Sequence, residues 1–125
     1  MITPIHSAAA PEPFGPYSSG AQIGNFVQVS GQLGIDRRTG GLAGEGAYGQ
    51  ARQAIANIAA ILGERDLGFD DVLMLRIFAE SPEQFPEINR AIEEVLTPPY
   101  PARTTLFAGL PVGIAVEIDA LAIIA

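Results

Sequence analysis

The chain contains no cysteine, no lysine and no tryptophan, and its only histidine is His6. Without cysteine, the protein can form no disulfide, no thiolate nucleophile and no cysteine-ligated zinc or iron–sulfur site. Without lysine, no side chain can form a Schiff base with a carbonyl substrate. A single histidine also excludes a His pair, either for a metal or for the two-histidine chemistry of a ribonuclease.

Positive charge is scarce as well. Seven arginines stand against 14 acidic residues, which gives a net charge of −7. Such a surface repels phosphate backbones, so we expect no nucleic-acid partner. No apolar run approaches the ~18 residues needed to cross a bilayer, and residues 1–13 lack the basic and apolar regions of a secretion signal. We therefore predict a cytoplasmic protein with no membrane partner.

Apolar residues, in contrast, are abundant. They make up 48% of the 125 residues, whereas only 17% are charged. This length suits one domain, spanning residues 1–125, and the composition excludes intrinsic disorder. A monomer of this size would leave a large apolar area in water, so we expect an oligomer.

The apolar pattern predicts the element order ββαβαββ, preceded by an extended, Pro-rich arm over residues 1–20. The predicted elements are a strand at 25–33, a short hairpin partner at 41–43, a helix at 48–65, a strand at 72–79 that suits cover on both faces, a helix between the Ser81 cap and Thr97, and strands at 104–108 and 115–124. This order predicts an α+β fold in which both helices lie on one face of a mixed sheet.

Each predicted helix has one apolar stripe. The stripes consist of Ala51, Ile55, Ile58 and Leu62 in the first helix, and of Phe85, Ile88, Ile92 and Val95 in the second. Because the helices cover only one face of the sheet, the other face is left bare. We expect that face to be buried between subunits.

Three motifs that often carry chemistry are weak here. Residues 44–49 match the dinucleotide-binding pattern GxGxxG, but they do not follow directly on a strand, so a flexible entry to the helix is the simpler interpretation. His6 stands alone in the arm and is more simply a surface or packing residue. Asp70 and Asp71 have no third acidic cluster beside them, so we predict neither a metal site nor a cofactor.

Two charged residues lie where a core or an interface is expected. Arg103 lies at the mouth of the strand predicted at 104–108, after a Pro-rich loop, where its fixed guanidinium could bind a carboxylate or form a structural salt bridge. Glu117 lies in the apolar last strand, on the same face as Asp119 and opposite Val116 and Ile118. A carboxylate in such a strand is either paired or functional.

The whole pattern resembles the Rid family of reactive-intermediate deaminases, also called L-PSP endoribonucleases. The resemblance rests on residues 15–18, 24–27, 29–32, 39–42, 50–54, 57–58, 70–72, 85–89, 101–105, 110–111 and 116–120. It implies a chorismate-mutase-like fold, a homotrimer with a central barrel of strands, and active sites in the clefts between subunits.

The resemblance also implies an activity, the hydrolysis of 2-imino acids such as 2-iminopropanoate and 2-iminobutanoate to 2-keto acids and ammonia. It implies that Arg103 binds the substrate carboxylate and that Glu117 holds the attacking water. The further pocket positions are Tyr17, Ser30, Gly31, Asn89 and Thr105, the last of which replaces a cysteine found in many deaminating members. Two alternatives stay open: a related hydrolase or lyase-type member that acts on another imine or enamine, and a non-catalytic regulatory trimer that binds a small molecule.

Overall fold

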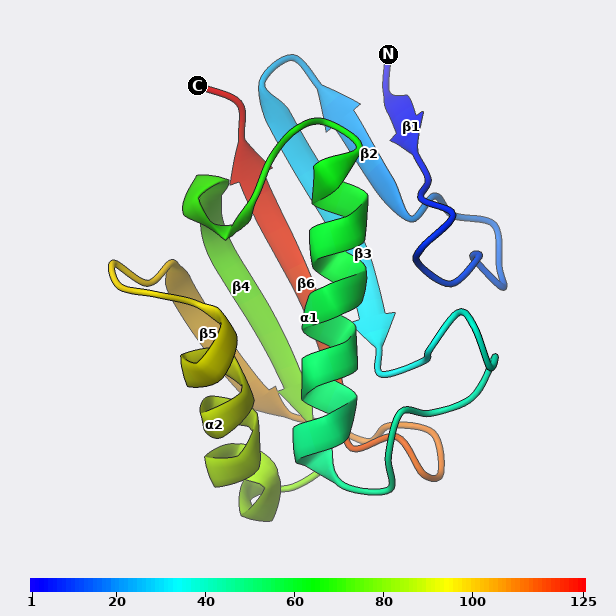
Figure 1. Ribbon diagram of the computed structural model, residues 1–125, viewed down its shortest axis with the longest axis vertical. Coiled ribbons are helices and arrows are strands. Elements are labelled where there is room, and N and C mark those ends of the chain that lie inside the picture. Colours follow the sequence, from blue (N-terminus) through cyan, green and yellow to red (C-terminus); the bar gives the residue numbers. More distant parts are fainter.

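Six strands form one mixed sheet in the computed structural model, which describes residues 1–125 (Figure 1). The elements are β1 (Thr3–Ile5), β2 (Gly20–Ile23), β3 (Phe26–Leu33), α1 (Ala47–Gly63), β4 (Val72–Ala79), α2 (Phe85–Val95), β5 (Ala102–Phe107) and β6 (Val116–Ile123), with short 3₁₀ turns at Phe69–Asp71 and Pro82–Gln84. The strand order is β1-β2-β3-β6-β4-β5. Only β4 and β5 run parallel, and the other neighbours are antiparallel.

The predicted fold class, α+β with two helices on one face of a mixed sheet, is confirmed. The helix predicted at 48–65 corresponds to α1, and the strand predicted at 72–79 corresponds to β4. The capping signal before the second helix is also present: the Ser81 backbone N–H donates to Gln84 Oε1 at 2.7 Å. This contact caps the 3₁₀ turn that leads into α2.

The predicted hairpin partner at residues 41–43 is confirmed only as a short contact with the chain after β3, and it is not a strand. That segment makes a single antiparallel bridge, between Ile35 and Leu42. The hairpin partner of β3 is β2, which lies in the segment assigned to the arm, and β1 adds a further short strand there. Gly24 and Asn25 form the hairpin loop, and Gly24 has the positive φ of 56° that such tight turns require. The glycine was therefore the turn signal that the sequence-based prediction missed.

The core lies between the helices and the face of the sheet that they cover. Two buried polar side chains of α1 tie the adjoining loops to it. Asn57 donates to the carbonyl oxygens of Leu33 and Ile35 at 3.2 and 3.0 Å. Gln50 donates to the Gly113 carbonyl and accepts the Ala115 N–H at 2.8 Å. The Asn57 bonds hold the chain at the end of β3 against α1. The Gln50 bonds hold the segment that leads into β6.

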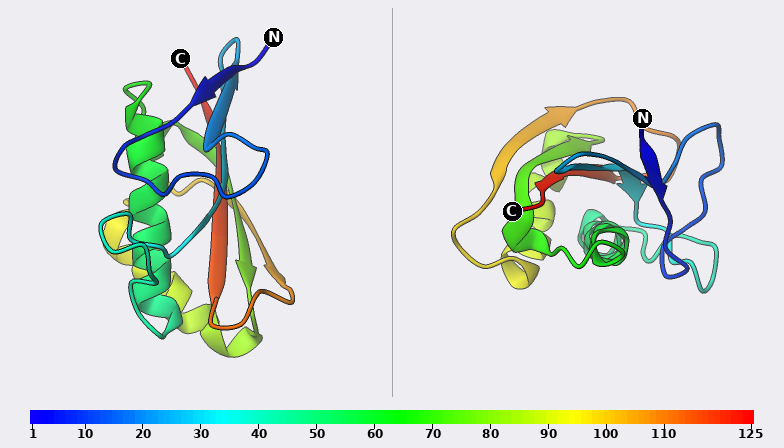
Figure 2. Two further views of the ribbon diagram at one scale, coloured as in Figure 1. Left: turned by 90° about the vertical axis from the view of Figure 1, so that its right-hand side faces the viewer. Right: turned by 90° about the horizontal axis from the view of Figure 1, so that it is seen from above.

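The opposite face of the sheet is not covered by any helix. Viewed from above, the sheet curves around α1 and α2, and its outer face has no helix against it (Figure 2). Apolar side chains are exposed there, including Phe26 at 59% and Leu106 at 53%. Within one chain, β4 is therefore covered on one face only. Neither helix is long and apolar enough to cross a membrane.

Candidate active site

The seven candidate residues separate into two groups on opposite faces of the sheet. In the pairing of β4 with β5, Arg103 lies beside Leu75 and Thr105 beside Ile77, and both of these β4 residues are buried under the helices. In the pairing of β4 with β6, Glu117 lies beside Phe78, which faces the open side. Arg103 and Glu117 of one chain therefore point away from each other.

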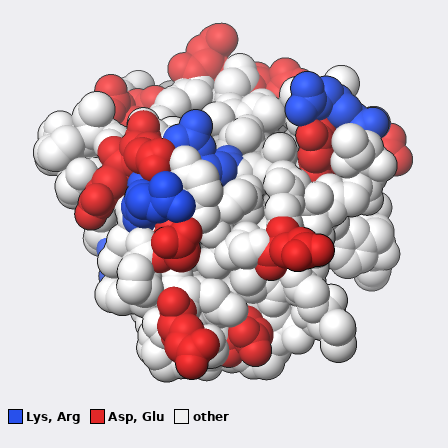
Figure 3. All heavy atoms as spheres, turned by 60° about the horizontal axis from the view of Figure 1, so that its bottom comes forward, with Lys and Arg blue, Asp and Glu red and all other residues white.

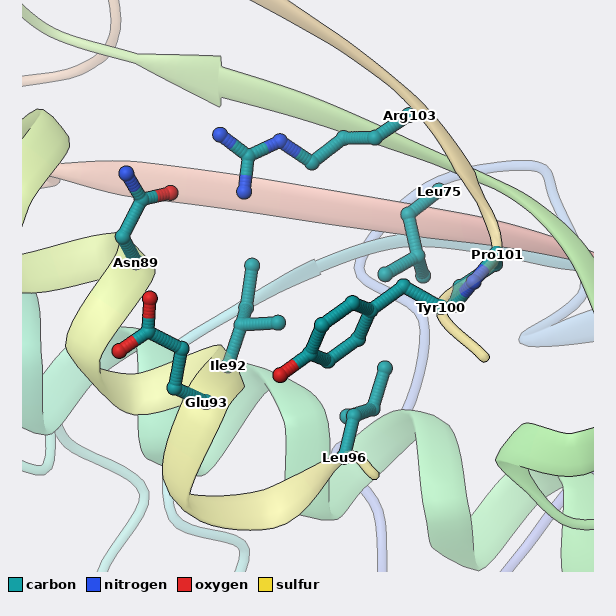
Figure 4. A pocket seen from close by; sticks show the side chains of 8 residues that line it. All are labelled: Leu75, Asn89, Ile92, Glu93, Leu96, Tyr100, Pro101 and Arg103. Atoms are coloured by element: carbon teal, nitrogen blue, oxygen red, sulfur yellow. The ribbon is translucent and has the colours of Figure 1, made fainter. Parts of the chain in front are cut away.

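The first group is the Arg103 half-site, which we define as Arg103, Asn89 and Thr105. A cavity of about 170 Å³ lies between β5 and α2 beside it (Figure 4). The lining residues are Leu75, Asn89, Ile92, Glu93, Leu96, Tyr100, Pro101 and Arg103. Figure 4 shows the guanidinium of Arg103 extended along this cavity toward Asn89.

Arg103 has no ion-pair partner within the chain, so the structural salt bridge considered from the sequence is not formed here. Its guanidinium carbon lies 5.1 Å from the centre of the Phe85 ring. Partial burial lowers the pKa of Arg103 from its ordinary value, although arginine keeps its charge in proteins. The half-site therefore presents a partly desolvated cation that an external carboxylate can pair with.

Two buried polar atoms beside Arg103 also lack partners. They are Asn89 Oδ1 and Thr105 Oγ1, and neither makes a hydrogen bond within the chain. Leaving a buried polar atom unpaired costs about 1–3 kcal/mol, so such atoms call for a specific explanation. A ligand with both a carboxylate and an N–H group would satisfy the cation and the amide oxygen together.

The second group is the Glu117 half-site, which consists of Glu117, Gly31, Ser30 and Tyr17. Glu117 is half-buried on β6 and makes no hydrogen bond or ion pair. Burial raises the pKa of its carboxyl, and the nearby carboxylate of Asp119 raises it further. A raised pKa makes Glu117 a stronger proton acceptor than an ordinary glutamate.

A β-bulge in β3 places Gly31 directly against Glu117. The register between β3 and β6 shifts by one residue between the pairs Val29–Ala120 and Gln32–Ile118. A Cβ atom at Gly31 would lie 2.8 Å from Glu117 Cδ. Glycine is therefore required at this position for the carboxylate to keep its place.

Ser30 and Tyr17 complete the half-site. Ser30 Oγ donates to the Ser18 carbonyl oxygen at 2.6 Å, which ties the bulge to the segment that carries Tyr17. Tyr17 packs edge-on against Phe14 and lines a small hollow together with Gly31. The Tyr17 ring is exposed in the single chain.

The sequence-based prediction missed two residues that lie beside the Arg103 half-site, Phe85 and Tyr100. Phe85 and Val95 were assigned to the buried stripe of the second helix, but they are 37% and 39% exposed. They lie at the two ends of α2, and Phe85 lies beside Arg103. Tyr100 lines the cavity but stands in a Pro-rich loop, where no periodic pattern marks it.

The structure forms neither a metal-ligand cluster nor the context of a dinucleotide-binding motif. No three His, Cys, Asp or Glu side chains come together in a way that could hold a metal ion. The GxGxxG match begins at Gly44, whereas β3 ends at Leu33, and Gly46 is simply the N-cap of α1. The motif therefore does not have the strand–turn–helix context of a dinucleotide site.

Known proteins resemble the chain along nearly its whole length. Residues 7–124 match the family model described as Endoribonuclease L-PSP. A 2-iminobutanoate/2-iminopropanoate deaminase of Dermatophagoides farinae is 36% identical over 96% of this chain and 94% of that protein, and one of Salmonella typhimurium is 33% identical over 98% of both.

Solved structures show the same likeness. RidA from the Antarctic bacterium Psychrobacter superposes with a TM-score of 0.92 at 35% identity, covering 98% of this chain and 99% of that one. TdcF of E. coli, solved with bound serine, gives a TM-score of 0.91 at 28% identity, with the same coverage of both chains.

Proposed function

Because this chain belongs to the L-PSP endoribonuclease family, also called the Rid family, we propose that it hydrolyses 2-imino acids to 2-keto acids and ammonia. The observation that carries the proposal is the Arg103 half-site, where an unpaired cation lies beside two unpaired polar atoms. The names of the deaminase relatives point to 2-iminopropanoate and 2-iminobutanoate as substrates. TdcF, which was solved with bound serine, indicates that an amino-acid-like molecule suits this fold.

In the proposed mechanism, Arg103 binds the substrate carboxylate through two guanidinium N–H groups, and Asn89 Oδ1 accepts an N–H of the imine nitrogen. Glu117 takes a proton from water as the water oxygen bonds to C2, which forms a tetrahedral carbinolamine. Glu117 then passes this proton to the nitrogen. The C2–N bond breaks as the hydroxyl becomes the keto oxygen, and its proton leaves with the ammonia. No cofactor takes part in these steps.

The two half-sites are proposed to come from neighbouring copies of the chain in a homotrimer. Two facts support this arrangement: Arg103 and Glu117 of one chain lie on opposite faces, and apolar side chains are exposed on the outer face of the sheet. Burial of that face between copies would place the Glu117 half-site of one chain against its neighbour. It would also remove water around the carboxylate, which strengthens its electrostatic interactions.

Two other functions use the same half-sites. A related family member could hydrolyse a different imine or enamine, and a non-catalytic trimer could bind a carboxylate ligand without reacting with it. RNA cleavage, which the family description mentions, is the least supported. Acidic side chains outnumber cationic ones on the face shown in Figure 3, and the chain has a single, exposed histidine, His6. That surface gives little attraction for a phosphate backbone.

The test is an imine-hydrolysis assay in which an amino-acid oxidase generates the imine and semicarbazide competes for it. We expect the wild-type protein to shorten the life of the imines from alanine and from 2-aminobutanoate. Arg103→Ala is expected to lower the rate at least about 100-fold, and Arg103→Lys to rescue it poorly, because an ammonium lacks the paired donors. Arg52→Met is the matched control, because it removes an exposed arginine of α1 that pairs with Glu94 and does not line the cavity.

Glu117→Gln separates binding from turnover. It keeps the shape of the side chain but removes the proton acceptor, so turnover is expected to fall while the Kd of a keto-acid product stays within a few-fold by calorimetry. A wild-type protein that binds the keto acid but never hydrolyses an imine would favour the non-catalytic function. A normal rate for Arg103→Ala would overturn the assignment of Arg103.

A further inference from the structure

An ion pair lies next to Glu117 on the open face of the sheet. Arg76 on β4 stands directly across from Asp119 on β6, and Asp119 lies two residues after Glu117, on the same face. Arg76 Nε donates to both carboxylate oxygens of Asp119 at 3.0 and 3.1 Å, and Arg76 Nη2 lies 2.9 Å from Oδ2. Both carboxylate oxygens of Asp119 thus accept charge-assisted hydrogen bonds from one guanidinium, which fixes the geometry of the pair.

The other neighbours of Glu117 carry no charge. Phe78 lies across from it on β4, and Leu33 and Gly31 adjoin it on β3. The helices lie behind the sheet, on its other face (Figure 2). Within the chain, the charged groups near Glu117 on this face are therefore Asp119 on its own strand and Arg76 on the neighbouring one.

We propose that Arg76 is a positioning residue for Glu117: by pairing with Asp119, it offsets part of the negative charge beside Glu117 and so extends to lower pH the range in which Glu117 can accept a proton. This inference rests on the proposed function, because it assigns the proton acceptor to Glu117. It adds a residue that touches neither the substrate nor the reacting atoms.

Electrostatics gives the expected size of the effect. Residues two apart on a strand are about 6.6 Å apart, so an unpaired Asp119 would repel an ionised Glu117 across a short distance. At that separation, and at a dielectric constant between those of a protein surface and water, the repulsion raises the pKa of a carboxyl by about 0.5–1.5. Removing Arg76 should therefore raise the pKa of Glu117, and removing the charge of Asp119 should lower that pKa.

The experiment compares the pH dependence of kcat/KM for wild type, Arg76→Met, Asp119→Asn and the double variant. For Arg76→Met, we expect the acid limb of this profile, where kcat/KM falls as Glu117 is protonated, to move to higher pH by about 0.5–1.5 pH units. For Asp119→Asn, we expect it to move down, because Arg76 is then an uncompensated cation. The double variant should lie close to wild type, which is the signature of coupling between the two residues. Arg52→Met changes the net charge by the same amount and should leave the limb in place.

Each result either supports the inference or overturns it. A purely structural ion pair would lower Tm in both single variants and leave the acid limb unmoved, and that result would overturn the proposal. Light scattering on each variant identifies any loss of assembly.

A second measurement does not depend on activity. The side-chain carboxyl carbon of Glu117 can be titrated by NMR, with Glu117→Gln used to assign its signal. If wild type proves inactive, the proposed function fails, but the same opposite shifts in Arg76→Met and Asp119→Asn would still support the coupling. If the enzyme is active but the titration of Glu117 is the same in all variants, the coupling is rejected and the proposed function stands.

Discussion

The Arg103 half-site and the Glu117 half-site lie on opposite faces of one sheet, and different interactions hold them in place. Packing against α2 shapes the first, where buried Leu75, Ile92 and Leu96 form the floor of the cavity. A backbone bulge and an ion pair shape the second, on a face that no helix covers. One chain therefore forms the cavity beside Arg103 by itself, whereas Glu117 lies on a face that no helix of the chain covers.

The largest effect is expected when the two half-sites are inactivated in different chains. Arg103→Ala and Glu117→Gln should each be nearly inactive alone. If neighbouring copies share each site, coexpression at equal levels with random assembly leaves about one site in four with both residues intact. The unfractionated mixture should therefore show about a quarter of wild-type activity. Trimers purified through two different tags contain both kinds of chain, so about one of their three sites is intact and they should show about a third of wild-type activity.

Mixing the two proteins without exchange of subunits is the control for this experiment. It should restore nothing. If coexpressed chains also remain inactive while forming mixed trimers, the two residues do not act in one shared site.

Core and open-face substitutions should separate folding from assembly. Ile77 is fully buried on the helix-covered face, so Ile77→Ala should cost about 2–5 kcal/mol of unfolding free energy and lower Tm markedly. Leu106 is exposed on the outer face, so Leu106→Asp should instead reduce the mass in light scattering from that of the proposed trimer, three times 13.1 kDa, toward that of the single chain. A stable trimer of Leu106→Asp would show that this part of the face is not buried between copies.

Gly31→Ala should damage only the Glu117 half-site. The added methyl group would displace the carboxylate, because no room exists beside Glu117 Cδ. We expect kcat to fall about 10- to 100-fold, the usual cost of misplacing a catalytic group by about 1 Å, while the Kd of a keto acid changes little. Gly63→Ala is the matched control, because a Cβ at the end of α1 meets no atom within 4 Å. Equal losses in both variants would contradict the close-contact argument.

The smallest effect concerns stability and pH. Burial raises the pKa of Glu117 in the folded protein, so the folded state binds the carboxyl proton more tightly than the unfolded chain does. The stability that this proton contributes is lost as the pH rises through the folded pKa. At pH 7 the ionised carboxylate therefore opposes folding. Glu117→Gln should raise Tm by on the order of 1–2 °C at pH 7, and the gain should vanish below the ordinary pKa of a glutamate. A Tm that falls at pH 7 would instead indicate a stabilising partner for the carboxylate.

Local pattern was enough to predict much of the fold. The stripe in residues 48–65, the apolar run in 72–79 and the Ser81–Gln84 cap each correspond to an observed element, because helix period, strand apolarity and capping act over a few residues. The same local chemistry identified Arg103 and Glu117, since a charge in an apolar strand is costly wherever that strand lies.

The sheet order, in contrast, followed only from the tertiary structure. β5 and β6 follow each other in sequence, but β4 lies between them. Their registers with β4 place Arg103 beside Leu75 and Glu117 beside Phe78, so the two side chains face opposite sides. The bulge that brings Gly31 against Glu117 and the pairing of Arg76 with Asp119 also depend on which strands are neighbours. The sequence by itself determined α1, β4 and the cap before α2, and it singled out Arg103 and Glu117 as candidates. Strand pairing joins residues far apart in the chain, so only the folded sheet decided which of those side chains can meet.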